Sequence, residues 1–235
     1  MNTDEKDEAI LELKRAAAVR AAQQIESGMI VGLGSGSTSR LAVQAIGQRV
    51  REGLKIIGIP TSEQTATQAR ALGISLSTLG DHPEIDLAID GADEVELGTL
   101  NLIKGGGGNQ LREKIVAVAS RRFLIIVDER KVVHQLGSRA KVPVEVAQFG
   151  WQATARRLAK LNGNPVLRLS ADNQPFVTDG GNYILDCAFG AISSPAALDR
   201  ELNDVVGVVE HGLFIGVASQ ALVGAQEGIR VLDRK

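Results

Sequence analysis

The sequence has little cysteine and few aromatic residues, and both shortages exclude classes of protein. A single cysteine, Cys187, cannot form a disulfide within the chain, and the first residues are acidic and polar where a signal peptide needs a basic and then apolar start. We therefore expect a reducing, cytoplasmic setting. One Trp, one Tyr and five Phe offer few platforms for stacking bases, and the formal net charge is −2, so no nucleic-acid partner is expected.

Long apolar runs are also missing. The runs at 30–33 and 123–127 stop well short of the roughly 18 to 20 residues that cross a bilayer, so no membrane partner is expected. A small-molecule partner fits this composition better. The length of 235 residues allows a medium-sized domain that carries a smaller one.

Short apolar runs alternate with amphipathic segments in the first part of the chain. Helical spacing begins in residues 10–25, with Gly28 as the expected left-handed terminator. The alternation predicts an α/β fold, Rossmann-like, with a mostly parallel sheet and helices on both faces. Its expected strands are 29–33, 54–59, 85–89 and 123–127, and its further helices are 41–50, 63–72 and 111–119.

After Lys141 the pattern predicts a smaller α+β unit of the split βαβ, ferredoxin-like type, with an antiparallel sheet. Its expected elements are strands 142–146, 166–169 and 205–210, a hairpin over 176–186 that turns at 179–182, and helices 151–161 and 195–202. Residues 214–223 and 229–232 are expected to return to the first sheet. The predicted division is an α/β domain of residues 1–141 and 213–235 and a small domain of residues 142–212.

A glycine- and serine-rich loop, residues 32–38, lies where the first strand meets a helix. Its backbone amides and the helix N-terminus could hold a phosphate, although a plain capped turn has the same composition. NAD and ATP are disfavoured, because Ser37 stands in place of the third glycine of a dinucleotide loop and the Gly-Lys-Ser/Thr of a P-loop is absent.

Asp90 and Asp93 follow the strand at 85–89, at the carboxyl end where open α/β sheets hold ligands. They could meet sugar hydroxyls, cap a turn or bind a hard metal ion. Lys104 stands before four consecutive glycines, which suggests close backbone approach to a ligand. It could neutralise an oxyanion or be a solvated surface charge. Glu113 begins the next helix, as a general base or as a partner of the helix dipole.

The other titratable residues give weaker signals. His82, His134 and His211 lack metal-ligand spacing and are expected to be structural or exposed. Cys187 is expected in the core. Lys14, on the first helix, has the pattern of a solvated face.

Four segments in order, 31–38, 90–94, 103–107 and 111–115, resemble ribose-5-phosphate isomerase of the A type. Segments 143–146 and 207–214 extend the resemblance over nearly the whole chain. It implies an enzyme of the pentose phosphate pathway that interconverts ribose 5-phosphate and ribulose 5-phosphate through a cis-enediolate, with no cofactor or metal. Alternatives on the same scaffold are a non-catalytic sugar-phosphate sensor, an amino-sugar phosphate deaminase and an acyl transferase.

The resemblance also implies residue roles. Glu113 is the base at carbon, Asp90 and Asp93 handle hydroxyl protons and ring opening, and Lys104 stabilises the enediolate. A lysine before the segment 143–146 also reaches the substrate, for which Lys141 is chosen over Arg139. The implied substrate and phosphate contacts are Lys14, Gly34, Ser35, Gly36, Ser37, Thr38, Gly105, Gly106, Gly107 and Lys141. The family's usual state is a homodimer or homotetramer.

Overall fold

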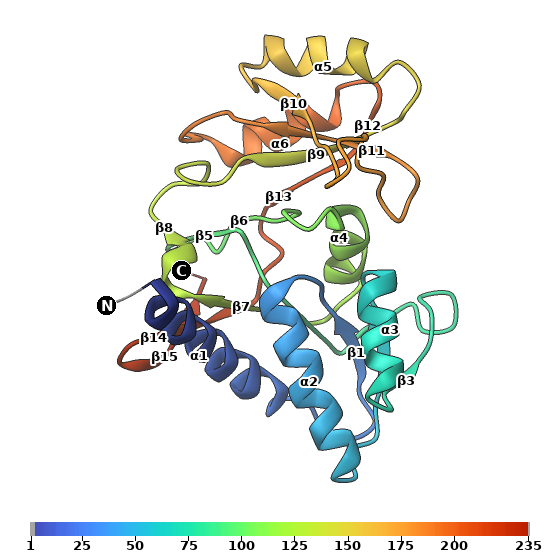
Figure 1. The fold of residues 1–235 in the computed structure, drawn as a ribbon, viewed down its shortest axis with the longest axis vertical. Coiled ribbons are helices and arrows are strands. Elements are labelled where there is room, and N and C mark those ends of the chain that lie inside the picture. Colours follow the sequence, from blue (N-terminus) through green and yellow to red (C-terminus); the bar gives the residue numbers. More distant parts are fainter. Residues whose placement is uncertain (1–2, 235) are drawn as a thin grey trace.

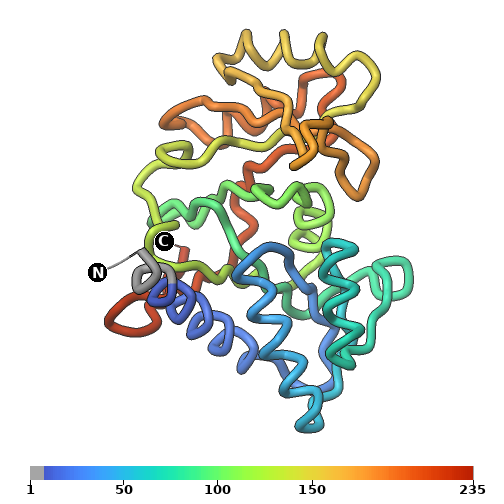
Figure 2. The backbone as a smooth tube through the Cα atoms, in the orientation of Figure 1, coloured from blue at the N-terminus to red at the C-terminus, as the bar shows by residue number. Residues whose placement is uncertain are grey.

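The computed structural model describes residues 3–234 (Figures 1 and 2). Its strands form three sheets. The largest sheet has the strand order β15-β14-β7-β4-β1-β2-β3, and every neighbouring pair is parallel except β14 and β15. The predicted mostly parallel sheet is therefore confirmed. Its strands are β1 (Ile30–Leu33), β2 (Ile57–Pro60), β3 (Ser75–Leu76), β4 (Leu87–Asp90), β7 (Phe123–Asp128), β14 (Gln220–Ala225) and β15 (Gly228–Asp233).

Both faces of this sheet are covered, because successive strand residues point to opposite sides. In β7, Leu124 and Ile126 pack with buried residues of α1 (Thr3–Ala22) and α2 (Ser37–Arg51). Ile125 and Val127 pack with α4 (Gln110–Val118) and Phe214 on the other side. Helix α3 (Glu63–Ala71) adds Ala69 to the first side and begins with a Ser62 hydroxyl that accepts from Thr65 N–H. The carboxyl ends of the strands thus meet at one edge between two layers of helices.

The second sheet is antiparallel and has the order β10-β11-β9-β12; Figure 1 draws it apart from the large sheet. It contains β9 (Val142–Val146), β10 (Pro165–Leu167), β11 (Tyr183–Cys187) and β12 (Val208–His211), with α5 (Trp151–Lys160) and α6 (Pro195–Asn203). The chain order β-α-β-β-α-β is the expected split βαβ arrangement. The domain boundaries at 141 and 213 stay predictions.

A third, small sheet was not anticipated. Its order is β13-β6-β5-β8, formed by β5 (Glu94–Glu96), β6 (Leu102–Ile103), β8 (Val132–Val133) and β13 (Leu213–Phe214), with the short 3-10 helix η1 (Glu129–Lys131) before β8. Strands of two or three residues are too short to show a period of two, so the sequence pattern could not reveal them. This sheet carries Lys104, the residue after β6.

Two local predictions were wrong. Helix α1 ends at Ala22, so Gly28, with a φ of +95°, serves a later turn directly before β1. The predicted hairpin over 176–186 forms a strand only from Tyr183 onward, although Thr178 N–H does donate to Asn182 C=O across the turn. The return of the chain to the first sheet is confirmed by β14 and β15. Within residues 3–234, no helix has the length and apolar character needed to span a membrane.

Candidate active site

The serine-rich loop follows β1 and opens helix α2. Gly36 immediately precedes the helix with a φ of +91°, a backbone conformation that favours glycine. Gly34 lies against the neighbouring strand, since a β-carbon at this position would be 2.2 Å from Asp90 Oδ1. The two glycines therefore let the loop turn and press against the end of β4.

Asp90 is the last residue of β4 and is only 2% exposed. Its Oδ1 accepts hydrogen bonds from the backbone N–H of Ser35 at 3.1 Å and of Gly91 at 2.8 Å, and from the Ser39 hydroxyl at 2.8 Å. Its Oδ2 lies 2.9 Å from Lys104 Nζ. Asp90 thus joins the serine-rich loop to the lysine.

Lys104 carries a buried ammonium group at the centre of the site. Its Nζ donates to the Gly91 carbonyl at 2.5 Å and lies 2.9 Å from Asp90 Oδ2 and 3.2 Å from Glu113 Oε2. Burial alone would lower the pKa of Lys104, but the nearby carboxylates of Asp90 and Glu113 outweigh burial and hold that pKa above its ordinary value. Lys104 is therefore a fixed cation, and the alternative of a solvated surface charge is wrong.

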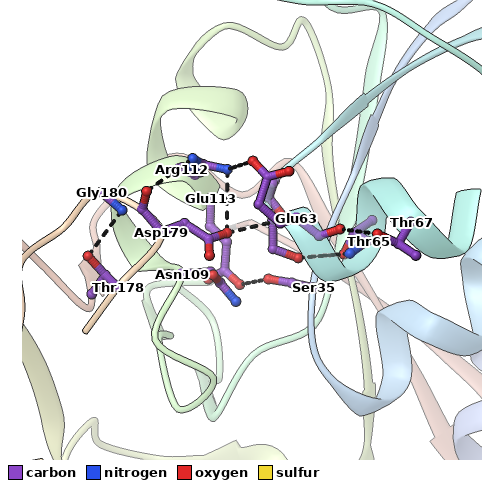
Figure 3. A network of polar contacts seen from close by, with 12 residues as sticks. Ser35, Glu63, Thr65, Thr67, Asn109, Arg112, Glu113, Thr178, Asp179 and Gly180 are labelled. Atoms are coloured by element: carbon purple, nitrogen blue, oxygen red, sulfur yellow. Dashed lines mark hydrogen bonds and ion pairs between the residues drawn. The ribbon is translucent and has the colours of Figure 1, made fainter. Parts of the chain in front are cut away.

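Glu113 lies in the first turn of α4 and is 5% exposed. Its Oε1 accepts a 2.5 Å hydrogen bond from the Ser35 hydroxyl (Figure 3). Burial, and then the charge of Asp90, raise the pKa of Glu113 to about 7, although Lys104 and Ser35 act in the opposite direction. A carboxyl group that titrates near neutral pH is suited both to take a proton and to return it.

Ser35, Lys104 and Glu113 line one cleft, which holds about 530 Å³ of empty space including its open mouth. The predicted site residues in its wall are Lys14, Ser35, Gly36, Ser37, Thr38, Asp93, Lys104, Gly105, Gly106, Gly107 and Glu113, and Gly91, Ala92 and Lys131 complete it. Asp90, Gly34 and Lys141 do not line it. Asp90 and Gly34 lie behind the wall, where they contact each other.

The structure places Lys141 outside the wall of this cleft, and its contact with the substrate stays a prediction. Lys141 is exposed and lines a neighbouring hollow together with Arg139, because β9 begins at the next residue and carries the chain away. Lys131, at the end of η1, lines both the hollow and the cleft. The signal that would have found Lys131 is its place three residues after β7, at the carboxyl end of a parallel strand.

Lys14 and Lys131 place two cationic side chains in the wall of the cleft. Lys14 Nζ donates to Ser37 Oγ at 3.3 Å, so Lys14 is not merely part of a solvated face. Ser37 and Thr38 are the first residues of α2, where unpaired backbone N–H groups and the helix dipole favour an anion. The part of the wall formed by Lys14, Ser37 and Thr38 has the chemistry of a phosphate site.

A polar network beside Glu113 joins α4, α3 and the turn at 178–182 (Figure 3). Arg112 Nη1 lies 2.9 Å from Glu63 Oε1 and 3.4 Å from Asp179 Oδ2, and Asp179 Oδ2 also accepts from Glu63 N–H at 3.0 Å. Because Arg112 directly precedes Glu113, this network holds the first turn of α4. Sequence reasoning missed it, since the partners of Arg112 are 49 and 67 residues away along the chain.

The histidines and the cysteine lie outside the cleft. His211 is fully buried, and burial, followed by the charge of Lys114, lowers its pKa to about 3. Cys187 is buried in β11, and burial raises the pKa of its thiol to about 12. In the part of the chain that the structure describes, no three His, Cys, Asp or Glu side chains are grouped so that they could hold a metal ion.

Comparison with known sequences identifies close relatives. Residues 57–228 match the family model described as ribose 5-phosphate isomerase A (phosphoriboisomerase A). A protein of Synechococcus sp. named ribose-5-phosphate isomerase A is 56% identical over 222 residues, which cover 94% of this chain and 96% of the relative. A protein of Gloeobacter violaceus with the same name is 57% identical over 220 residues, covering 94% and 95%.

Comparison with solved structures agrees over nearly the full length. Ribose 5-phosphate isomerase A from Methanocaldococcus jannaschii superimposes with a TM-score of 0.91 at 40% identity, covering 95% of this chain and 99% of that chain. A D-ribose-5-phosphate isomerase in complex with phospho-erythronic acid superimposes with a TM-score of 0.93 at 38% identity, covering 96% and 99%.

Proposed function

Because the chain belongs to the ribose 5-phosphate isomerase A family, we propose that it interconverts ribose 5-phosphate and ribulose 5-phosphate in the cleft described above. One observation carries this proposal. Glu113 and Lys104 face a common cleft whose wall also contains Lys14, Lys131 and the start of α2, so a base, an electrophile and an anion site surround the same space.

Glu113 is the proposed base. In the open-chain sugar it removes the proton from C2, which forms a cis-enediolate, and, after exchange of that proton with solvent, it donates a proton to C1. The same carboxyl group must therefore accept and donate within one turnover, and a pKa of about 7 makes both steps accessible near neutral pH.

Lys104 is the proposed electrophile. A C–H group beside a carbonyl is a very weak acid, so stabilisation of the enediolate oxygen matters as much as the base. The ammonium group is already held by the Gly91 carbonyl and by Asp90 at 2.9 Å. It needs little rearrangement when charge develops on the substrate, which is the condition under which a fixed cation accelerates a reaction most.

The two acids have different proposed tasks. Asp93 lines the cleft and accepts a 2.8 Å hydrogen bond from Gly106 N–H, so it is the candidate for handling hydroxyl protons during ring opening. Asp90 is buried behind the cleft wall, and the geometry supports a positioning role for it instead: it holds Lys104 and the serine-rich loop.

Lys14, Ser37, Thr38 and Lys131 are proposed to bind the substrate phosphate. The relative bound to phospho-erythronic acid shows that a phosphorylated sugar acid occupies a protein of this fold. Binding of the remote phosphate would hold the reacting carbons in register with Glu113, which converts binding energy into orientation.

The homodimeric or homotetrameric state and the cytoplasmic location stay predictions. The first is supported by the family resemblance and the second by the single, buried cysteine.

The proposed function is tested by incubating the purified protein with ribose 5-phosphate in deuterated water and following both ketose formation and the position of deuterium. The expected result is ketose with deuterium at C1. Absence of ketose, or ketose formation that the Glu113→Gln variant retains in full, would refute the proposed function or the role of Glu113, respectively. Ammonia release from an amino-sugar phosphate would instead identify a deaminase.

A further inference from the structure

The glycine loop, residues 105–108, is built without side chains of its own, yet it contributes to the wall of the cleft. Gly105 has a φ of +98°, and a β-carbon on it would be 2.7 Å from Gln110 Oε1. A β-carbon on Gly106 would be 2.8 Å from Asp93 Oδ1. Glycine is therefore required here for space, but glycine also leaves the backbone freer than any other residue. Something else must hold these peptide groups in one orientation.

Arg168, which directly follows β10 of the antiparallel second sheet, holds them. One edge of its guanidinium group is bound by Asp186, through Nε at 2.9 Å and Nη2 at 2.5 Å. The remaining nitrogen, Nη1, donates to the carbonyl oxygens of Gly105 and Gly106, each at 3.1 Å. The side chain is 15% exposed and does not line the cleft. Arg168 thus holds the glycine loop from behind.

Because the peptide bond is planar, the hydrogen bonds from Arg168 to the two carbonyl groups also fix the direction of the N–H groups that follow them. In a trans peptide the C=O of one residue and the N–H of the next point in opposite directions. With the Gly105 carbonyl on Arg168, the Gly106 N–H points the other way, and it donates to Asp93 Oδ2 at 2.8 Å. With the Gly106 carbonyl on Arg168, the Gly107 N–H also points away from Arg168. Gly107 lines the cleft, and this N–H has no hydrogen-bond partner within residues 3–234.

We infer that Arg168 is a positioning residue for the isomerisation. It orients the glycine loop so that the Gly106 amide fixes Asp93 and the Gly107 amide is presented to the oxygen of the reacting sugar. The inference rests on the proposed function and deepens it, because it assigns a task in the reaction to Arg168, which follows a strand of the antiparallel second sheet. Phe176 supports the same loop, since a β-carbon on Gly108 would be 2.5 Å from its ring.

The test compares Arg168→Ala with Asp186→Asn and Arg168→Lys in the isomerase assay. Removal of one oxyanion donor lowers kcat by about 100-fold to 1000-fold, and a donor that is misdirected but present should lose less. We expect Arg168→Ala to lower kcat by roughly 10-fold to 100-fold, with KM changed less than about threefold, because the phosphate contacts are untouched. Asp186→Asn and Arg168→Lys should also lower kcat, since each disturbs the hydrogen bonds of the guanidinium group to Asp186 and to the glycine loop.

Chemical rescue separates positioning from a general loss of packing. Millimolar guanidinium chloride, well below denaturing concentration, should restore part of the kcat of Arg168→Ala and leave Asp186→Asn unimproved. Arg157→Ala is the matched control: Arg157 is an exposed arginine of the same unit, on α5, and its loss should change neither kcat nor the response to guanidinium.

The outcomes distinguish the two proposals. If the wild-type protein does not isomerise ribose 5-phosphate, the proposed function fails. If the wild type is active but Arg168→Ala keeps its kcat within twofold, loses activity only through KM, or loses kcat that guanidinium cannot restore, the role of Arg168 is refuted. Should Arg168→Ala fail to fold, Arg168→Lys and Asp186→Asn test the role of Arg168 instead: a lower kcat with a nearly unchanged KM supports the role, and an unchanged kcat refutes it.

Discussion

Replacing Ser35 by alanine should make the isomerisation more sensitive to acid. The Ser35 hydroxyl donates a 2.5 Å hydrogen bond to Glu113 and so stabilises the charged form of the base, which lowers the pKa of Glu113. Without this bond the pKa of Glu113 rises. Since only the charged carboxylate can take the C2 proton, a smaller share of the Ser35→Ala enzyme is active at any pH on the acid side of the profile.

The expected size follows from the structure. With the pKa of Glu113 at about 7, roughly a tenth of the wild-type base is charged at about pH 6 and nearly all of it at about pH 9. A hydrogen bond to a charged group contributes about 1.5 kcal/mol, which is about a factor of ten in an equilibrium. The ratio of kcat/KM at the lower pH to that at the higher pH should therefore fall about tenfold further in Ser35→Ala.

The assay follows ketose formation over the pH range for four proteins. Ser35→Thr keeps a hydroxyl group beside Glu113, and Ser37→Ala removes a neighbouring hydroxyl that does not contact Glu113, so both should keep the wild-type ratio. Ionisation of the substrate phosphate affects all four proteins alike. A wild-type ratio in Ser35→Ala would show that this hydrogen bond does not control the protonation of the base.

Four further results are expected. Glu113→Gln should lower kcat at least about 100-fold, the usual minimum for loss of a general base, and near-normal turnover would remove Glu113 from that role. Lys131→Ala should raise KM for ribose 5-phosphate while Lys141→Ala leaves KM near that of the wild type, and steady-state kinetics showing the reverse would restore the original choice of Lys141. Gly34→Ala should reduce the free energy of unfolding in urea by about 1 to 3 kcal/mol, because the added methyl group would meet Asp90 at 2.2 Å; an unchanged midpoint would contradict that contact. Activity should survive dialysis against a strong chelator, because the proposed electrophile is an ammonium group, and a loss that magnesium reverses would favour a metal site instead.

Much of the fold could be predicted because its signals are local. The apolar runs that became β1, β4 and β7 and the helical spacing of α2 and α4 are patterns within ten or fifteen residues. The antiparallel second sheet was anticipated for the same reason. The third sheet was not, because its strands have only two or three residues and exist through pairing with distant segments.

In the candidate site, too, the residues with a local sequence signal could be predicted and the others could not. Glu113, Lys104 and Asp93 were identifiable by their places beside a helix start, a glycine run and a strand end. Lys131 was not considered beside Lys141 and Arg139, because its place in the cleft wall depends on where the chain turns after β7.

By itself, the amino-acid sequence determined most of the helices and longer strands and the chemical groups at their ends, because both follow from short-range periodicity and from the conformations that glycine alone permits. Only the tertiary structure decided the state of those groups. The charge of Lys104, the neutral-range pKa of Glu113 and the hold of Arg168 on the glycine loop depend on burial and on distances of about 3 Å between segments far apart in the chain. No local sequence pattern predicts these distances, since they arise only when the sheets pack together.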